Sequence, residues 1–386
     1  MKKYLNLENY FLLVIFLLPA YLLRFTIFKI PENLWEILAV ISIILALEKI
    51  KKENNFTLSG YEKKIIFLFL IIIIGLALGM IKSGNYSVGL GIIKSWFLVP
   101  FAFAFLANRI IEDKKRLYSS LYLSILIVAV IALIYKFLGI LTFDGRLQAF
   151  FNSPNYLAMF LAPGVIIGVF SSGLKNLKLL KILKLIIIAL AIFFTYSYAS
   201  WISIIFAVLI IFFLTHKISG KHILFLVLIF LIVVFLSKDT SKFQDLANYN
   251  SRSSLASRIM IWQSAEKIAK DNYLIGIGPG NFQDKYLEYQ KYFPPYLQWA
   301  APHPHNLYLA FWLSAGLIGL LAFIGILYLF FTKVEMRQSA MIETRHCLVS
   351  TVAAGIIIYF LLHGLVDTTY FKNDLSVVFW MAIFLV

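Results

Sequence analysis

The chain has 386 residues, of which 61% are hydrophobic and only 14% are charged. A soluble domain carries roughly 25% charged residues, so this composition excludes that class and predicts an all-α polytopic membrane protein. The formal net charge of +16 would suit a nucleic-acid partner, but the basic residues fall in short loops between apolar runs. Such loops face the cytoplasm in membrane proteins, and we therefore expect no nucleic acid as a partner.

Apolar runs long enough to cross a membrane, about 20 residues each, recur along the chain. We expect twelve spans, at 10–29, 33–48, 65–81, 88–108, 118–140, 153–173, 185–198, 200–215, 222–237, 305–331, 345–365 and 374–386. The runs 185–198 and 200–215 are short for a full crossing, and one long tilted helix is the alternative. No separable soluble domain is evident, so we expect a single integral membrane domain over residues 1–386.

The distribution of charge predicts the orientation. Loops on the side of the N-terminus hold most of the lysines and arginines, at positions such as 49–52, 63–64, 109–116 and 175–184. Loops on the other side hold little more than Lys29, Lys82, Arg146 and Lys372. Because cytoplasmic loops carry the excess of basic residues, we expect both termini to be cytoplasmic.

One long polar segment, residues 238–304, is expected to form a large loop on the far side. It contains "SLASRIMIWQSAEKIAKDN", in which Leu255, Ile259, Trp262, Ala265 and Ala269 recur at helical spacing. This pattern predicts an amphipathic helix that could lie on the membrane face. The helix leads into "LIGIGPGNF", whose glycines predict a tight irregular turn. Loops of this length in a compact protein are usually functional.

The loop ends in Pro302-His303-Pro304-His305, directly before an expected span. Asn306 is a plausible N-cap of that span, which puts His305 at the membrane–water boundary. Imidazole is a suitable proton acceptor there, although an interfacial polar residue is the alternative. A metal site is another alternative, in which His303 and His305 would need a third ligand such as Asp284 or Glu288.

Three arginines are expected on the same side as these histidines. Arg252 and Arg258 have no acidic partner at helical spacing, and Arg258 lies one turn before Trp262. Guanidinium groups at a membrane face suit phosphate recognition, with anionic lipid headgroups as the alternative ligand. Arg146 is the third arginine, and the nearby Asp144 could neutralise it. The sequence contains no Asp-x-Asp triplet that would hold a divalent cation against a diphosphate.

Three motifs resemble those of the O-antigen ligase and O-antigen polymerase superfamily. "HNLYLAFWLSAGLIG" is similar to its His-Asn, nine residues, Gly-x-x-Gly signature and contains His305, Asn306, Gly316 and Gly319. "GRLQAFFNSPNYLA" resembles its arginine and Pro-Asn segment, with Arg146 and Asn155. "SRIMIWQSAEKIAKDNYLIGIGPGNF" resembles its Arg-x-x-x-Trp helix, which runs into Gly-x-Gly-x-x-x-Phe. The motifs occur in the order expected for the family.

Two positions depart from this resemblance. The family often has Ser-Arg-Gly-Ala at the turn between the seventh and eighth spans, whereas this chain has Ser197-Tyr198-Ala199-Ser200. The glutamate often found two residues before the first glycine of the histidine motif is Ser314 here. The first departure removes an arginine from the set that would hold a lipid diphosphate.

The resemblance implies a GT-C-like glycosyltransferase in the bacterial inner membrane, with a periplasmic active site and no metal or cofactor. An O-antigen ligase would move a glycan from undecaprenyl diphosphate to a sugar of the lipid A core. A polymerase of O-antigen or capsule, a protein O-oligosaccharyltransferase and, from another class, a lipid-linked oligosaccharide flippase are the alternatives. His305 would be the base and Arg258 would stabilise the diphosphate. The expected substrate-binding residues are Arg146, Arg252, His303, Asn306, Trp262 and Asn155.

Overall fold

The computed structural model describes residues 2–27, 30–53, 56–170, 179–215, 254–294, 298–340 and 345–386, with a few single positions between 216 and 253. The expected span 222–237 lies outside the described residues, apart from isolated positions. The same holds for Arg252 and for the first part of the long loop.

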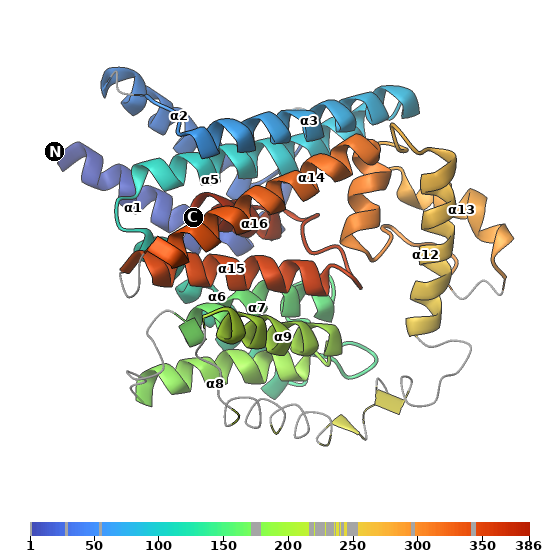
Figure 1. The fold of residues 1–386 in the computed structure, drawn as a ribbon. Helices are drawn as coiled ribbons and strands as arrows, with labels where there is room; N and C mark the ends of the chain where they lie inside the picture. The colour runs from blue at the N-terminus through green and yellow to red at the C-terminus, as the bar shows by residue number, and fades with distance from the viewer. Residues whose placement is uncertain are drawn as a thin grey trace.

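The described residues are almost entirely helical (Figure 1). The α-helices are α1 (Lys2–Phe16), α2 (Leu34–Glu53), α3 (Gly60–Ser83), α4 (Tyr86–Ile92), α5 (Val99–Ile110), α6 (Lys114–Phe137), α7 (Pro154–Phe170), α8 (Leu179–Phe194), α9 (Tyr198–Leu214), α12 (Ser254–Asp271), α13 (Phe282–Tyr289), α14 (Leu307–Ala340), α15 (Arg345–His363) and α16 (Asn373–Phe384). The described residues also contain two 3₁₀ helices, η1 (Leu18–Leu22) and η4 (Gln290–Tyr292), and one π-helix, η2 (Ile93–Leu98). Strands β1 (Arg24–Ile27) and β2 (Ile30–Asn33) form an antiparallel pair.

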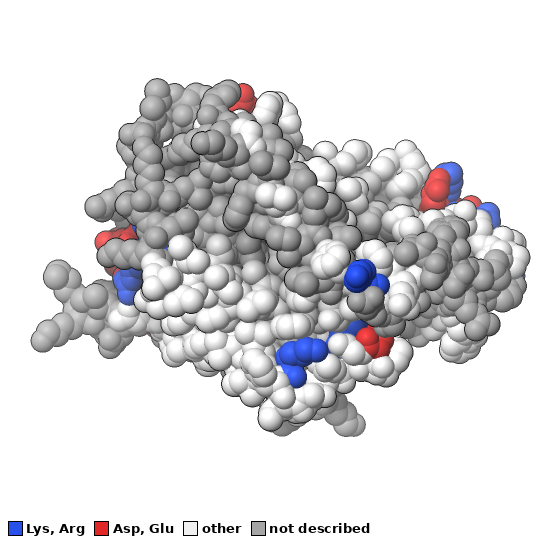
Figure 2. Space-filling view, turned by 90° about the horizontal axis from the view of Figure 1, so that it is seen from below, with Lys and Arg blue, Asp and Glu red and all other residues white. Residues whose placement is uncertain are grey.

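Four of the described helical segments are long and apolar enough to cross a membrane. They are Gly60–Ser83, Tyr86–Ile110, Lys114–Phe137 and Leu307–Met336, and five shorter apolar helices accompany them. On the face drawn in Figure 2, an uncharged area separates the charged side chains at the left edge from those right of centre and at the right edge. These features are those of a helical membrane protein, because charged groups are costly in the lipid core.

The expected first span, 10–29, is wrong in its second half. Helix α1 ends at Phe16, and Pro19 lies in the first turn of η1, since proline has no N–H with which to continue an α-helix. The chain then enters β1, where Arg24 pairs opposite Asn33 of β2. The expected pair of short helices in place of one long helix is confirmed. Helices α8 and α9 are separated by a turn in which Tyr196 has φ of 47°.

The long helices lie side by side, and α12 stands across one end of the bundle (Figure 1). The predicted amphipathic helix is confirmed as α12, but its buried face differs from the expected one. Leu255 and Ile259 are exposed, whereas Met260, Ile261, Ala265, Ile268 and Ala269 are buried. These side chains pack with residues of α13 and α14 in a small core of their own. This core fixes the loop end of the bundle, where the candidate site lies.

Helix α14 is interrupted at Gly316, whose φ of 71° and ψ of −179° are not helical. A side chain there would meet the backbone, because a Cβ would lie 2.0 Å from the carbonyl oxygen of Leu274. The glycine turn docks into this break through bonds from Ile277 N to Leu313 O (2.7 Å) and from Leu317 N to Tyr273 O (3.2 Å). The motif glycines therefore have a structural role, which is to let two backbones meet directly.

Candidate functional site

The proline-flanked segment before α14 is held from both sides. Asn306 caps the helix, because its Oδ1 accepts from the N–H groups of Tyr308 and Leu309 at 3.0 Å each, which confirms the predicted N-cap. Trp262 of α12 donates from Nε1 to the carbonyl oxygen of His305 at 3.1 Å. His305 has φ of 46°, a strained conformation for a residue with a side chain. Such strain persists where the surroundings impose it, often at functional sites.

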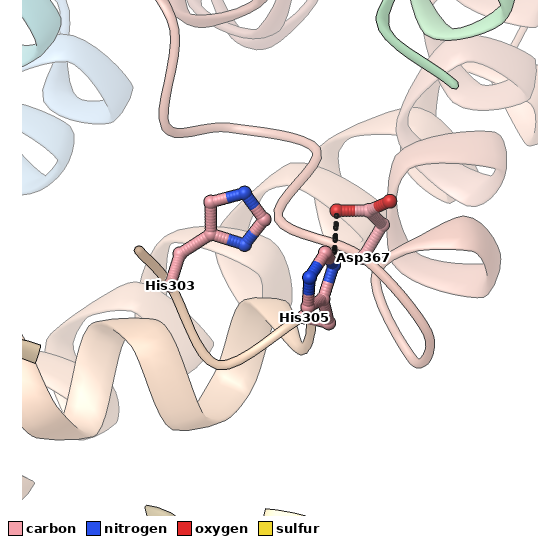
Figure 3. Close-up of side chains that lie close together, drawn as sticks. All are labelled: His303, His305 and Asp367. Carbon is pink, nitrogen blue, oxygen red and sulfur yellow. Dashed lines mark hydrogen bonds and ion pairs between the residues drawn. The ribbon is translucent and has the colours of Figure 1, made fainter. Parts of the chain in front are cut away.

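His305 meets a buried carboxylate that sequence reasoning did not identify (Figure 3). Its Nδ1 lies 3.3 Å from Oδ1 of Asp367, in the loop between α15 and α16. The side chain of Asp367 is 1% exposed and that of His305 is 20% exposed. A carboxylate at Nδ1 favours the tautomer that carries its proton there, which leaves Nε2 free to accept one. A signal for Asp367 existed, since it is a lone acid after a long apolar run.

Arg258 of α12 shares the same carboxylate. Its Nη2 lies 3.5 Å from Oδ2 of Asp367, so the partner missing at helical spacing is found in another loop. Burial alone would raise the pKa of Asp367, but the hydrogen bond from His305 and the charge of Arg258 hold that pKa below its usual value. Asp367 is therefore ionised and couples the expected base to the expected phosphate-binding arginine.

Arg146 joins this cluster through Asn155. The Arg146 guanidinium donates from Nη2 to Asn155 Oδ1 at 2.7 Å and from Nε to the carbonyl oxygen of Thr195 at 2.8 Å. Asn155 in turn donates from Nδ2 to Asp367 Oδ2 at 3.5 Å. Asp144 stands 4.0 Å from Arg146, at the limit of an ion pair. Burial lowers the pKa of Arg146.

His303 lies beside His305 but in a different environment. The two ring centroids are 4.2 Å apart, and His303 Nε2 pairs with the Tyr156 hydroxyl at 2.8 Å. Burial and the neighbouring His305 lower the pKa of His303 to about 3. Its Nδ1 is buried and has no hydrogen-bond partner among the described residues, and Figure 3 shows it on the side of His305. A neutral His303 suits positioning better than proton uptake.

A metal ion is the other occupant that this geometry allows. The ligand atoms of His303, His305 and Asp367 lie within 4.8 Å of one another. The third ligand is therefore Asp367, whereas the expected candidate Glu288 forms an ion pair with Lys285 at 2.8 Å. Two histidines and a carboxylate are a known zinc-ligand set. Arg258 already contacts the second oxygen of Asp367, so a cation would have to share this carboxylate with it.

The turn between α8 and α9, where Tyr198 stands in place of the arginine often found in the family, lies next to Arg146. Tyr198 begins α9 and its hydroxyl lies 3.5 Å from Oγ1 of Thr240. Arg146 binds the carbonyl oxygen of Thr195 in the same turn. A guanidinium group is thus present at this turn although residue 198 does not supply one.

Comparison with known families gives one match. A family model described as O-Antigen ligase matches residues 183–324, a range that contains α12, the glycine turn, His305 and the break in α14. No curated protein matches the chain. Residues 183–324 are therefore similar to the O-antigen ligase family, which supports the resemblance that the motifs indicated.

Proposed function

We propose that this protein is an O-antigen ligase. It transfers a finished glycan from undecaprenyl diphosphate to a hydroxyl of a lipid A-core sugar, at the periplasmic end of the bundle. The observation that carries the proposal is the sharing of one buried carboxylate, Asp367, by His305 and Arg258. A base and a diphosphate-binding cation are the two groups that this reaction requires side by side.

His305 acts on the acceptor. The proton of the acceptor hydroxyl moves to His305 Nε2 while the hydroxyl oxygen bonds to the anomeric carbon of the donor glycan. Asp367 stabilises the imidazolium that forms, because it is ionised and accepts from Nδ1. His303, which Tyr156 holds in place, positions the acceptor and does not take its proton.

The arginines act on the donor. The bond between the anomeric carbon and the diphosphate breaks, and undecaprenyl diphosphate leaves with the electron pair. Arg258 and Arg146 stabilise the charge that grows on the diphosphate oxygens, a role that a metal ion has in other transferases. Their shared contacts, through Asp367 and Asn155, hold both guanidinium groups at one end of the bundle. The reaction is therefore metal-independent in this proposal.

Transfer in vitro tests the proposal. Purified protein is incubated with a defined undecaprenyl-diphosphate glycan as donor in three separate reactions. The first contains lipid A-core as acceptor, the second contains donor alone, and the third contains a Ser/Thr peptide. The masses of the products are measured by mass spectrometry. One glycan added to lipid A-core supports the ligase. A ladder formed from donor alone would replace it with a polymerase, and a glycopeptide with a protein O-oligosaccharyltransferase. No transfer to any acceptor, with movement of the donor across a vesicle membrane, would make the protein a flippase.

A further inference from the structure

A cavity of about 260 Å³ lies beside His303, and Thr368, Phe371 and Lys372 of the loop that carries Asp367 also line it. Helices α4, η2, α7 and α14, the glycine turn and the loop before α16 all contribute to its walls. Tyr156 and His303 line it, so it shares a wall with the proposed catalytic cluster. None of the roles assigned above uses the rest of this cavity.

The cavity has an unusual balance of charge. Two cations, Arg24 and Lys372, line it, and no carboxylate does. Glu32 of β2 and Glu36 of α2 form ion pairs with Lys94 at 2.6 and 3.1 Å. Within the described part of the chain, neither Arg24 nor Lys372 forms an ion pair. The cavity therefore has two cations and no carboxylate among its lining residues.

Lys372 is held in a position to bind a ligand. Its Nζ lies 3.0 Å from the centre of the Tyr156 ring, over its face. Burial lowers the pKa of Lys372 to about 8, partly opposed by the nearby Asp374. A buried ammonium without a carboxylate at ion-pair distance is costly, and an anionic ligand would offset this cost.

The remaining walls suit a sugar ring. Trp96, Phe282 and Phe371 supply flat apolar faces, and Ser314 supplies a hydroxyl group. Trp96 is fixed, because its Nε1 donates to Asn373 Oδ1 at 3.3 Å and its carbonyl oxygen accepts from the Tyr370 hydroxyl at 2.9 Å. Sites for small ligands typically have apolar and aromatic walls with a small number of polar groups.

We propose that this cavity binds an anionic sugar, carrying a carboxylate or a phosphate group, of the acceptor glycan. The inference rests on the proposed function, because it assigns the two substrates to different groups of residues around the histidine pair. The donor diphosphate lies with Arg258 and Arg146 beside Asp367, and the acceptor sugar lies with Lys372 and Arg24 in the cavity beside His303. A hydroxyl of that sugar then reaches His305 past the edge of the His303 ring, since the two ring centroids are 4.2 Å apart.

Direct binding of small probes tests the proposal without any transfer reaction. The purified full-length protein is titrated with methyl β-glucuronide, glucose 6-phosphate and the neutral methyl β-glucoside, and binding is followed by saturation-transfer NMR. We expect at least one anionic sugar to bind about tenfold more tightly than the glucoside, the effect of one charged hydrogen bond. Lys372→Met and Arg24→Gln should each abolish that preference. Lys270→Met, an exposed change on α12, is the matched control and should keep it.

Inorganic pyrophosphate separates this inference from the proposed function. Its binding should be lost in Arg258→Gln and kept in Lys372→Met, and binding of the anionic sugar should show the opposite pattern. Equal binding of charged and neutral sugars to the unchanged protein would overturn the inference and leave the diphosphate site intact. Loss of pyrophosphate binding in Lys372→Met, but not in Arg258→Gln, would assign the cavity to the donor and overturn both. Because Arg24 is exposed, its variant keeps the test decisive if Lys372→Met does not fold.

Discussion

Asp367 and His305 lie 62 residues apart in the sequence, yet Oδ1 of the first is 3.3 Å from Nδ1 of the second. The contact joins the loop before α14 to the loop before α16, and Arg258 reaches the same carboxylate from α12. Three separate segments thus meet at one buried charge. Each residue of this group has a different expected role, and substitution can separate them.

Asp367→Asn should lower single-turnover transfer by about 100-fold to 10,000-fold, the range for loss of acid–base assistance. The amide has nearly the shape of the carboxylate but cannot stabilise the imidazolium, and it leaves Arg258 without a counter-charge. Asp144→Asn is the control, because Asp144 contacts Arg146 only at 4.0 Å, and should stay within a few-fold of the unchanged protein. Equal activity of both variants would remove Asp367 from the mechanism.

His305→Ala and His303→Ala should differ strongly. His305→Ala removes the base and should cost about 100-fold to 10,000-fold in turnover, with lipid donor still bound. His303→Ala removes one buried hydrogen bond to Tyr156 and should cost about tenfold at most. Single-turnover kinetics on folded, purified variants measure both. An inactive His303→Ala beside a nearly normal His305→Ala would mean that the roles are reversed.

The sequence predicted the residues of this site better than their contacts. His305, Arg258 and Arg146 stand in motifs whose spacing is local, so a pattern can reveal them. Asp367 and Lys372 stand in a short loop without a pattern, and only the packing of α15 and α16 brings them to the histidines. The hairpin at Arg24–Asn33 was missed for a related reason, since its apolar residues continue the hydrophobicity of α1. Hydropathy predicts where helices run, but not which buried groups meet between them.

Chelation should leave transfer unchanged. The arginines already supply positive charge at the proposed diphosphate site, and Arg258 contacts the carboxylate that a metal would need. Activity is measured after dialysis against EDTA, and after addition of zinc, magnesium or manganese. Loss of activity that one of these ions restores would instead assign His303, His305 and Asp367 as metal ligands.

Gly316→Ala should destabilise the protein. Its φ of 71° and ψ of −179° belong to a region that is essentially restricted to glycine, and the new Cβ would meet the carbonyl oxygen of Leu274. A cost of about 1 to 3 kcal/mol is typical of such strain, so the melting temperature should fall. Gly91→Ala is the matched control, because its Cβ would meet nothing within 4 Å. A melting temperature unchanged in both would mean that the break in α14 is not required for folding.

Binding of the anionic sugar should weaken as pH rises above about 8, where Lys372 loses its proton. The groups that act on Lys372 are Asp374 and Asp367, which raise this pKa, and Arg24, which lowers it. The folded-state pKa lies below the ordinary value of 10.5, so the unfolded chain binds more protons between these values and stability rises with pH there. Loss of binding above pH 8 is therefore not caused by unfolding, and the melting temperature should not fall with it. Lys372→Arg keeps its charge throughout this range and should remove the pH dependence. The same decline in Lys372→Arg would show that another group titrates.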